Sequence, residues 1–327
     1  MFATLTVTFP FFALVLCGYL AARRGLLPIA AIPGMNTFVL FFALPCMLFR
    51  FGASTPIAQL LDPVVALSYL FCALVMVALA VWVTLRGRIG WNDAAFGALV
   101  AAFPNTGFMG VPLLVALLGA QAAGPAIVTI LVDMVITTSL CIALSRLGPA
   151  PDDASQASAT QAARTALKGV ASNPMPWAIL SGALASAYGW HLPGPLASTL
   201  AMLADSASPV ALFTIGTVLA RSHMQAVSGQ GPAVRWSEVV PVAAMKLFVH
   251  PLLVLAVGWA VMAAGLPLDR FAWYVVVLVA ALPSASNVSM LAERFGADNG
   301  RIARIILVST SAAFLTFSGV VACLPRP

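Results

Sequence analysis

The sequence predicts an all-α integral membrane protein with ten transmembrane helices, arranged as two inverted five-helix repeats. Three observations support this fold class: a very apolar composition, ten apolar blocks that account for nearly the whole chain, and short motifs shared by the two halves. Of the 327 residues, 61% are hydrophobic and 8% are charged, whereas a soluble domain carries roughly a quarter charged residues. In lipid, by contrast, apolar surface needs no polar cover.

Each apolar block is long enough for a membrane-spanning helix, which needs about 20 mostly apolar residues. The ten blocks lie at about 2–22, 33–53, 62–85, 91–118, 122–147, 174–190, 196–220, 238–264, 269–295 and 302–323. Residues 1–22 have no Lys or Arg before the apolar stretch, which favours a first helix over a signal peptide. The polar segment 148–170 predicts a linker. The chain is thus divided into an N-terminal repeat at 1–147, the linker, and a C-terminal repeat at 171–327.

The distribution of basic residues predicts the orientation in the membrane. The loops after spans 1, 3, 5, 7 and 9 hold twelve Lys and Arg residues, whereas the opposite side holds three, namely Arg50, Arg270 and Arg326. Cytoplasmic loops carry the excess of Lys and Arg. We therefore expect a multi-pass protein of the bacterial inner membrane with both termini on the non-cytoplasmic side.

Composition argues against several other function classes. The net charge of +6 comes from basic residues scattered between apolar blocks, without the basic stripe that nucleic acid requires. The five cysteines form no C-x-x-C pair, and the three histidines form no H-E-x-x-H motif. We expect no nucleic-acid partner, no metal, no enzymatic activity, and no cofactor apart from a coupling H⁺ or Na⁺.

The internal similarity follows the same order in both halves. Gly18-x-Leu20-Ala21 in span 1 matches Gly182-x-Leu184-Ala185 in span 6, and the segment around Pro45 in span 2 matches that around Pro209 in span 7. Ile130-Leu131-Val132-Asp133 in span 5 corresponds to Ile306-Leu307-Val308-Ser309 in span 10. Because each half has an odd number of spans, the second half enters the membrane inverted. Inverted repeats are typical of alternating-access transporters.

Spans 4 and 9 each contain a helix-breaking cluster at mid-depth. Proline removes a backbone donor and clashes with the preceding turn, and the freed backbone groups are tolerated in a membrane only where they are buried or line a cavity. A plain proline kink would explain one such cluster, but two at corresponding positions favour a binding site. Half-helix N-termini favour anions. The expected substrate-binding residues here are Pro104, Asn105, Thr106, Gly107, Pro283, Ser284, Ser286 and Asn287.

These segments resemble the auxin efflux carrier family, which includes bacterial malonate-type transporters. The resemblance rests on Asn36-Thr37-Phe38-Val39 running into Ala43-Leu44-Pro45, on Pro104-Asn105-Thr106-Gly107, and on residues 281–288 with 291–296. It implies the fold of bile-acid–sodium symporters, with a scaffold of spans 1, 2, 6 and 7 and a mobile core of spans 3–5 and 8–10. It further implies carriage of a small organic anion, a mono- or dicarboxylate, and a homodimer formed through spans 2 and 7.

Ionisable residues inside the apolar blocks are further candidates, because a charge at that depth is costly. Asp133 is the expected ion-coupling residue, with a proton favoured over sodium, for which Asn105, Thr106, Ser284 and Ser286 could supply oxygen ligands. Lys246 could neutralise a carboxylate substrate, pair with Asp133, or snorkel to the surface.

The repeat-related prolines, Pro45 and Pro209, and Asp205 are expected in the scaffold or gate. Two alternatives to an organic-anion carrier stay open, a sodium-coupled bile-acid-type symporter and a channel.

Overall fold

The computed structural model describes residues 2–54, 62–86, 89–147, 174–190, 192–227 and 235–324. Within these ranges the chain is helical and forms no strand, apart from one isolated β-bridge. The predicted linker at 148–170 lies outside the described residues. Six described helices are long and apolar enough to cross a membrane, and four shorter apolar helices lie in the remaining four predicted spans.

In the N-terminal half, five predicted spans contain the following helices. They are α1 (Phe2–Arg23), then η1 (Ile29–Ala31), α2 (Ile32–Phe38), η2 (Val39–Ala43) and α3 (Leu44–Ser54), then α5 (Pro63–Arg86), then α6 (Trp91–Ala102), η3 (Thr106–Gly110) and α7 (Val111–Leu118), and finally η4 (Ala120–Ala122), α8 (Ala123–Val132), η5 (Asp133–Thr137) and α9 (Thr138–Leu144). The segments η2, η3 and η5 are π-helical turns within longer helices.

In the C-terminal half, α11 (Pro174–Ala187) and α12 (Gly194–Val227) come first. They are followed by α13 (Trp236–Ala244), η6 (Met245–Val249) and α14 (His250–Ala263), then by α15 (Arg270–Ala280) and α16 (Asn287–Arg294), and lastly by α17 (Asn299–Cys323). The segment η6 is a fourth π-helical turn. Such turns are rare and are frequently found at functional sites.

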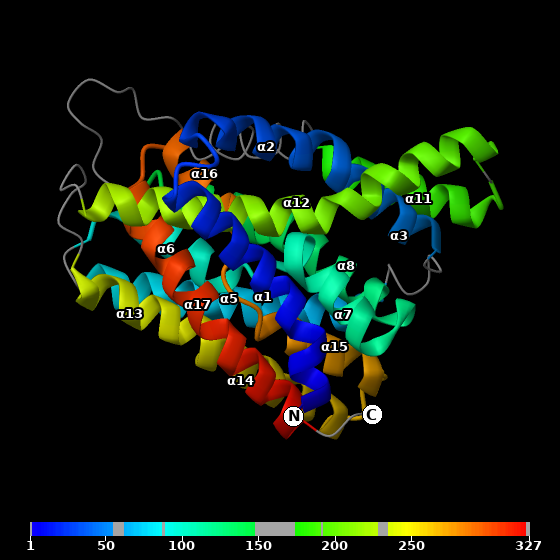
Figure 1. Cartoon of the computed structure of the whole chain (residues 1–327). Helices are drawn as coiled ribbons and strands as arrows, with labels where there is room; N and C mark the ends of the chain where they lie inside the picture. The colour runs from blue at the N-terminus through cyan, green and yellow to red at the C-terminus, as the bar shows by residue number, and fades with distance from the viewer. Residues whose placement is uncertain are drawn as a thin grey trace.

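The helices pack into two groups, and most contacts are made within a group. In the first, α1 packs along α12, and α3 packs against both α11 and α12. In the second, α5 packs on α6, α13 on α17, α14 on α15, and α15 on α8. Figure 1 shows the long α12 crossing the molecule with α2 and α3 beside it. The groups meet mainly where α1 and α12 contact α7, η3 and α17.

Four glycines allow the helices of the first group to approach very closely. A Cβ atom added to Gly18 of α1 would overlap the carbonyl oxygen of Phe213 in α12, and one added to Gly216 would overlap that of Val15. In the same way, Gly52 of α3 and Gly182 of α11 each face a backbone carbonyl of the other helix. Small residues at such positions let membrane helices make backbone contact.

One buried arginine ties together the helix ends of the second group. Arg301 in the first turn of α17 is 2% exposed and donates from Nη1 to the Asp93 carbonyl of α6 at 2.9 Å and from Nε to the Glu238 carbonyl of α13 at 3.4 Å. The guanidinium packs on Gly97, where a side chain would crowd it. These contacts hold α6, α13 and α17 in one unit.

The start of α1 and the end of α17 lie near the same edge of the molecule (Figure 1). The two helices pack on each other, and the rings of Phe12 and Phe314 meet edge to face with centroids 5.1 Å apart.

The glycine contacts generate a stability prediction. Replacing Gly216 with Ala should destabilise the protein by about 1–3 kcal/mol, because the new methyl group must push α1 away from α12. Thermal melting in detergent would measure the change. Gly319→Ala in α17 is the matched control, since nothing lies within 4 Å of its added Cβ. Equal melting temperatures for the two variants would contradict the close approach of α1 and α12.

Candidate functional site

Both predicted helix breaks are present in the structure. In predicted span 4, α6 ends at Ala102, and helical structure resumes at Thr106. Phe103 has φ −90° and ψ 106°, the extended conformation favoured for a residue before proline. In predicted span 9, α15 ends at Ala280, and α16 begins at Asn287. In each case a proline lies inside the break, where it removes a backbone donor and disfavours the helical conformation of the preceding residue.

The two breaks lie directly against each other and exchange backbone hydrogen bonds. The Asn105 amide donates to the Pro283 carbonyl at 2.8 Å, and the Ala285 amide donates to the Phe103 carbonyl at 2.9 Å. These bonds make the isolated antiparallel bridge between Pro104 and Ser284. Each break therefore supplies partners for polar backbone groups that the other exposes, which removes a large cost of interrupting a helix at membrane depth. We call residues 103–108 and 281–287 the crossover.

A pocket lies on one side of the crossover, between the two groups of helices. Its empty volume is about 340 Å³ including its open mouth. The second group contributes crossover residues and two residues of predicted span 5, and the first group contributes three apolar side chains from α3 and α11. The lining residues are Leu44, Leu48, Phe103, Pro104, Asn105, Gly107, Phe108, Ile130, Met134, Met175, Ala285 and Asn287.

The pocket therefore brings together four of the predicted substrate-binding residues, Pro104, Asn105, Gly107 and Asn287. The side-chain amides of Asn105 and Asn287 each offer donors and an acceptor. The π-helical segment η3, which continues into α7, and the helix α16 begin beside the pocket, so the positive ends of their helix dipoles lie near it. No acidic or basic side chain is among the lining residues. This arrangement suits a small anion that hydrogen-bonds to amides.

The remaining crossover candidates lie behind the pocket wall. Thr106 and Ser284 are fully buried. The Ser284 backbone N–H donates to Ser309 Oγ at 3.3 Å, and the Pro283 carbonyl accepts from the Asn105 backbone N–H. Ser286 is partly exposed and does not line the pocket. In the structure, these residues build the crossover more than they line the pocket.

Asp133 is fully buried and faces away from the pocket. Its neighbours Ile130 and Met134 line the pocket, whereas its own carboxylate accepts hydrogen bonds from Tyr69 Oη of α5 at 2.7 Å and from Thr137 Oγ1 at 3.0 Å. Asp133 also begins the π-helical turn η5. Both carboxylate oxygens therefore have partners, as a buried acidic group requires.

Lys246 is also fully buried, so it does not snorkel to a surface. Its Nζ lies 2.9 Å from His250 Nδ1 and donates to the Ala280 carbonyl at 2.9 Å. It does not line the pocket, and its ammonium forms no ion pair with Asp133 within 4.0 Å. The wide π-helical turn η6 contains Lys246, whose ammonium reaches the end of α15.

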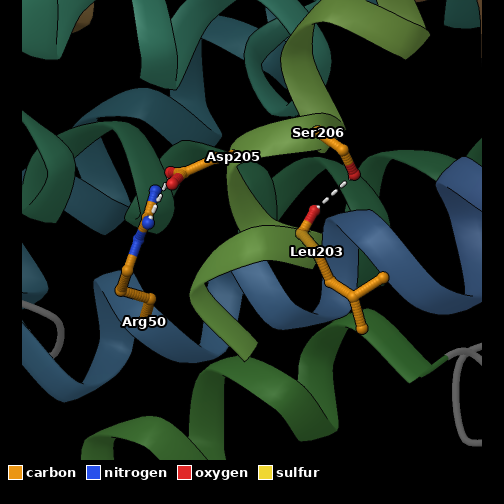
Figure 2. A network of polar contacts seen from close by, with 4 residues as sticks. All are labelled: Arg50, Leu203, Asp205 and Ser206. Carbon is orange, nitrogen blue, oxygen red and sulfur yellow. Dashed lines mark hydrogen bonds and ion pairs between the residues drawn. The ribbon is translucent and has the colours of Figure 1, made fainter. Parts of the chain in front are cut away.

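Asp205 of α12 forms an ion pair with Arg50 of α3, with 2.6 Å between Arg50 Nη1 and Asp205 Oδ1 (Figure 2). Figure 2 shows the two side chains reaching toward each other from different helices, while Ser206 Oγ donates to the Leu203 carbonyl within α12. Neither charged residue lines the pocket. Pro45 lies between the pocket residues Leu44 and Leu48, and Pro209 lies inside α12, which stays helical through it.

Sequence reasoning missed Tyr69 and the four π-helical turns. A tyrosine within an apolar block carries a hydroxyl group that usually finds a partner when buried, so Tyr69 was a detectable candidate. The π-helical turns have no comparable signal in the residues, because they depend on how neighbouring helices pack.

Comparison with known proteins matches residues 4–321 to the family model described as membrane transport protein. The chain belongs to this family. Its members, which include the auxin efflux carriers, are transporters and not enzymes, so the resemblance and the expected absence of enzymatic activity are confirmed.

The relatives of this chain include bacterial and plant proteins. A protein of Rhizobium meliloti (strain 1021) named "Putative malonate transporter" is 29% identical over 319 residues, which cover 95% of this chain and 92% of that protein. The uncharacterized transporter YfdV of Escherichia coli (strain K12) is 26% identical over 290 residues, which cover 88% of this chain and 86% of that protein. Auxin efflux carrier component 4 of Arabidopsis thaliana is 30% identical over 113 residues, 34% of this chain and 18% of that protein.

The Tyr69 contact generates a prediction. Replacing Tyr69 with Phe removes one donor from the buried Asp133 carboxylate, which should cost about 1–3 kcal/mol of stability. Thermal melting in detergent would measure the loss, and Tyr188→Phe at the 80%-exposed position near the end of α11 is the control. A Tyr69→Phe protein that melts at the wild-type temperature would show that this hydrogen bond contributes nothing.

Proposed function

We propose that this transporter moves a small organic anion, a malonate-like mono- or dicarboxylate, across the bacterial inner membrane by alternating access. The observation that carries the proposal is the position of the pocket. It lies at the crossover and is closed on its other side by α3 and α11 of the first helix group. A movement of one group against the other would open such a pocket to either side of the membrane.

The chemistry of the pocket supports an anionic substrate. Half-helix N-termini and two asparagine amides provide N–H donors, and the apolar side chains of α3 and α11 exclude water around them. Crossover residues Pro104, Thr106, Gly107, Pro283, Ser284 and Ser286 would fix the shape of the site, while Asn105 and Asn287 would bind the carboxylate. The name of the Rhizobium relative agrees with a dicarboxylate.

We further propose that ten spans form two inverted repeats, with the first helix group as scaffold and the second as moving core. The glycine contacts support this symmetry. Gly18 and Gly182 are separated in sequence by the same number of residues as Gly52 and Gly216, and as Pro45 and Pro209. The α1–α12 contact and the α11–α3 contact are thus made by corresponding residues of the two halves.

The proposal extends to topology and assembly. Both termini would be outside the cytoplasm, in agreement with the neighbouring ends of α1 and α17, and labelling of introduced cysteines from each side would test this. A homodimer would form through α3 and α12, near Pro45, Pro209 and Asp205, and light scattering in detergent would give the oligomeric state.

Transport by reconstituted protein tests the proposed function directly. Uptake of malonate and related carboxylates into proteoliposomes should saturate and show counterflow, whereas a channel would give ohmic current. Asn105→Ala and Asn287→Ala should each weaken substrate binding about 10- to 100-fold, since a hydrogen bond to a charged group contributes about 1.5–3 kcal/mol. The Asn105 substitution leaves the backbone bonds of the crossover in place.

The control for these variants is Asn36→Ala in α2, which lies outside the pocket lining. Normal transport by both Asn105→Ala and Asn287→Ala would place the substrate elsewhere. Failure of every carboxylate to show counterflow with wild-type protein would contradict the anion-carrier proposal as a whole.

Asp133 would couple transport to a proton, with sodium as the alternative. Asp133→Asn keeps a polar group beside Tyr69 but cannot release a proton. This variant should still exchange substrate across the membrane, yet it should fail to accumulate substrate against a pH gradient. Parallel exchange and accumulation assays would separate the two effects, and wild-type accumulation by Asp133→Asn would reduce Asp133 to a packing residue.

A further inference from the structure

Two short helices beside the crossover, α6 and α16, contact each other and run in opposite directions. The first leads into the break at Phe103, and the second leads away from the other break, beginning at Asn287. The crossover hydrogen bonds join the two helices at this end, where Asn105 and Asn287 line the pocket. How α16 is held at its other end therefore bears on the position of Asn287.

At that other end, the turn that follows α16 is bound to the first turn of α6. The Asn92 side chain donates from Nδ2 to the Phe295 carbonyl at 3.1 Å. Asp93 Oδ1 accepts a hydrogen bond from the Asp298 backbone N–H at 2.6 Å. The rings of Phe96 and Phe295 lie against each other, with centroids 6.0 Å apart. We call these three contacts the latch.

The helix α17 reinforces the latch. Asp298 is the N-cap of α17, and its Oδ1 accepts from the Arg301 backbone N–H at 3.0 Å. The Arg301 guanidinium returns to α6, where it donates to the Asp93 carbonyl at 2.9 Å. These hydrogen bonds form a closed ring from Asp93 through Asp298 and Arg301 back to Asp93. Moving the turn after α16 away from α6 would break this ring.

The latch is close enough to the pocket to influence it through α16. This helix has 8 residues, from Asn287 to Arg294, and at 1.5 Å per residue it is about 12 Å long. It is held at its first residue by the crossover and just beyond its last residue by the latch. Binding groups need to be kept within about 0.5 Å of their productive positions by the residues that support them. A loosened latch would let α16 tilt and would displace Asn287.

We propose that Asn92 and Asp93 are positioning residues, which hold α16 through the latch so that Asn287 meets the substrate. This inference rests on the proposed carrier function and deepens it, because it assigns part of the substrate affinity to two residues that do not line the pocket. Neither residue touches the substrate. Both act through the placement of the Asn287 amide beside that of Asn105.

The two residues need opposite chemistry, which gives a pair of nearly isosteric tests. Asn92 must donate because the Phe295 carbonyl only accepts, whereas Asp93 must accept because the Asp298 backbone N–H only donates. Asp93→Asn keeps an oxygen acceptor, so the malonate concentration for half-maximal uptake should stay within about twofold of wild type. Asn92→Asp has no donor, so this concentration should rise about tenfold, as for a lost hydrogen bond to a charged group. The reverse order would overturn the inference.

A double substitution tests whether the latch acts through Asn287. Asp93→Ala should raise the half-saturating malonate concentration about tenfold with less than a twofold change in maximal rate, whereas mere loss of folded protein would lower only the maximal rate. In an Asn287→Ala background the same substitution should change that concentration less than twofold, because residues that share one function are not additive. An equal tenfold effect in both backgrounds would overturn the inference.

Hydrogen exchange in detergent tests the latch without any substrate. Asp93→Ala should accelerate exchange of the α16 amides at least tenfold, and Asp93→Asn less than twofold. The control is Asp62→Ala, which removes the cap bonds to the Val64 and Val65 amides of α5 and should leave α16 unchanged. Wild-type exchange of α16 in Asp93→Ala would overturn the inference. Absence of counterflow for every carboxylate would instead contradict the proposed function, and the exchange result would still support or overturn the latch.

Discussion

Two backbone hydrogen bonds, from Asn105 to Pro283 and from Ala285 to Phe103, make the crossover possible. A proline at mid-membrane leaves peptide groups without helical partners, and lipid offers none in return. Each break supplies a hydrogen-bond partner for a backbone group of the other. Either break alone would leave these groups unpaired in the membrane, which costs free energy. The position of α15 is thereby fixed relative to α6, and the start of η3 and of α16 is brought to the same pocket. The geometry of the pocket therefore follows from the need to satisfy the backbone hydrogen bonds of the two breaks.

The buried polar side chains behind the crossover are also paired by hydrogen bonds. Asp133 satisfies its oxygens with Tyr69 and Thr137, and Lys246 satisfies an orphan carbonyl at the end of α15. Each is carried by a π-helical turn, where the helix takes up an extra residue and alters the direction of the side chain. The ionisable groups thus lie within the second helix group, out of contact with the pocket. Asp133 is linked to the pocket by its helix neighbours Ile130 and Met134, whereas Lys246 is linked to the end of α15 that leads into the crossover.

The first helix group is held together by different forces. Its helices approach each other backbone to backbone at Gly18, Gly52, Gly182 and Gly216. Such contacts leave no room for larger side chains at these four positions. The ion pair of Arg50 and Asp205 adds a link between α3 and α12 and gives a partner to one of the few basic residues expected outside the cytoplasm. Between the groups, contacts are fewer. This contrast suits two units that move against each other.

The sequence by itself determined where the helices lie and where two of them break. The length of the apolar blocks predicted the helical segments, and the proline clusters predicted the interruptions at 103–105 and 281–286. Both features can be read from a short stretch of sequence, since apolar length must match the bilayer and proline lacks a backbone N–H. It also indicated Asn105 and Asn287 beside the breaks. Only the tertiary structure decided that the breaks pair with each other, that Lys246 turns toward Ala280 and not toward the pocket, that Asp133 meets Tyr69, and that Asp205 meets Arg50. These partners are far apart in the chain, and their pairing depends on helix rotation and on π-helical turns, which helix–helix packing sets and residue patterns do not encode.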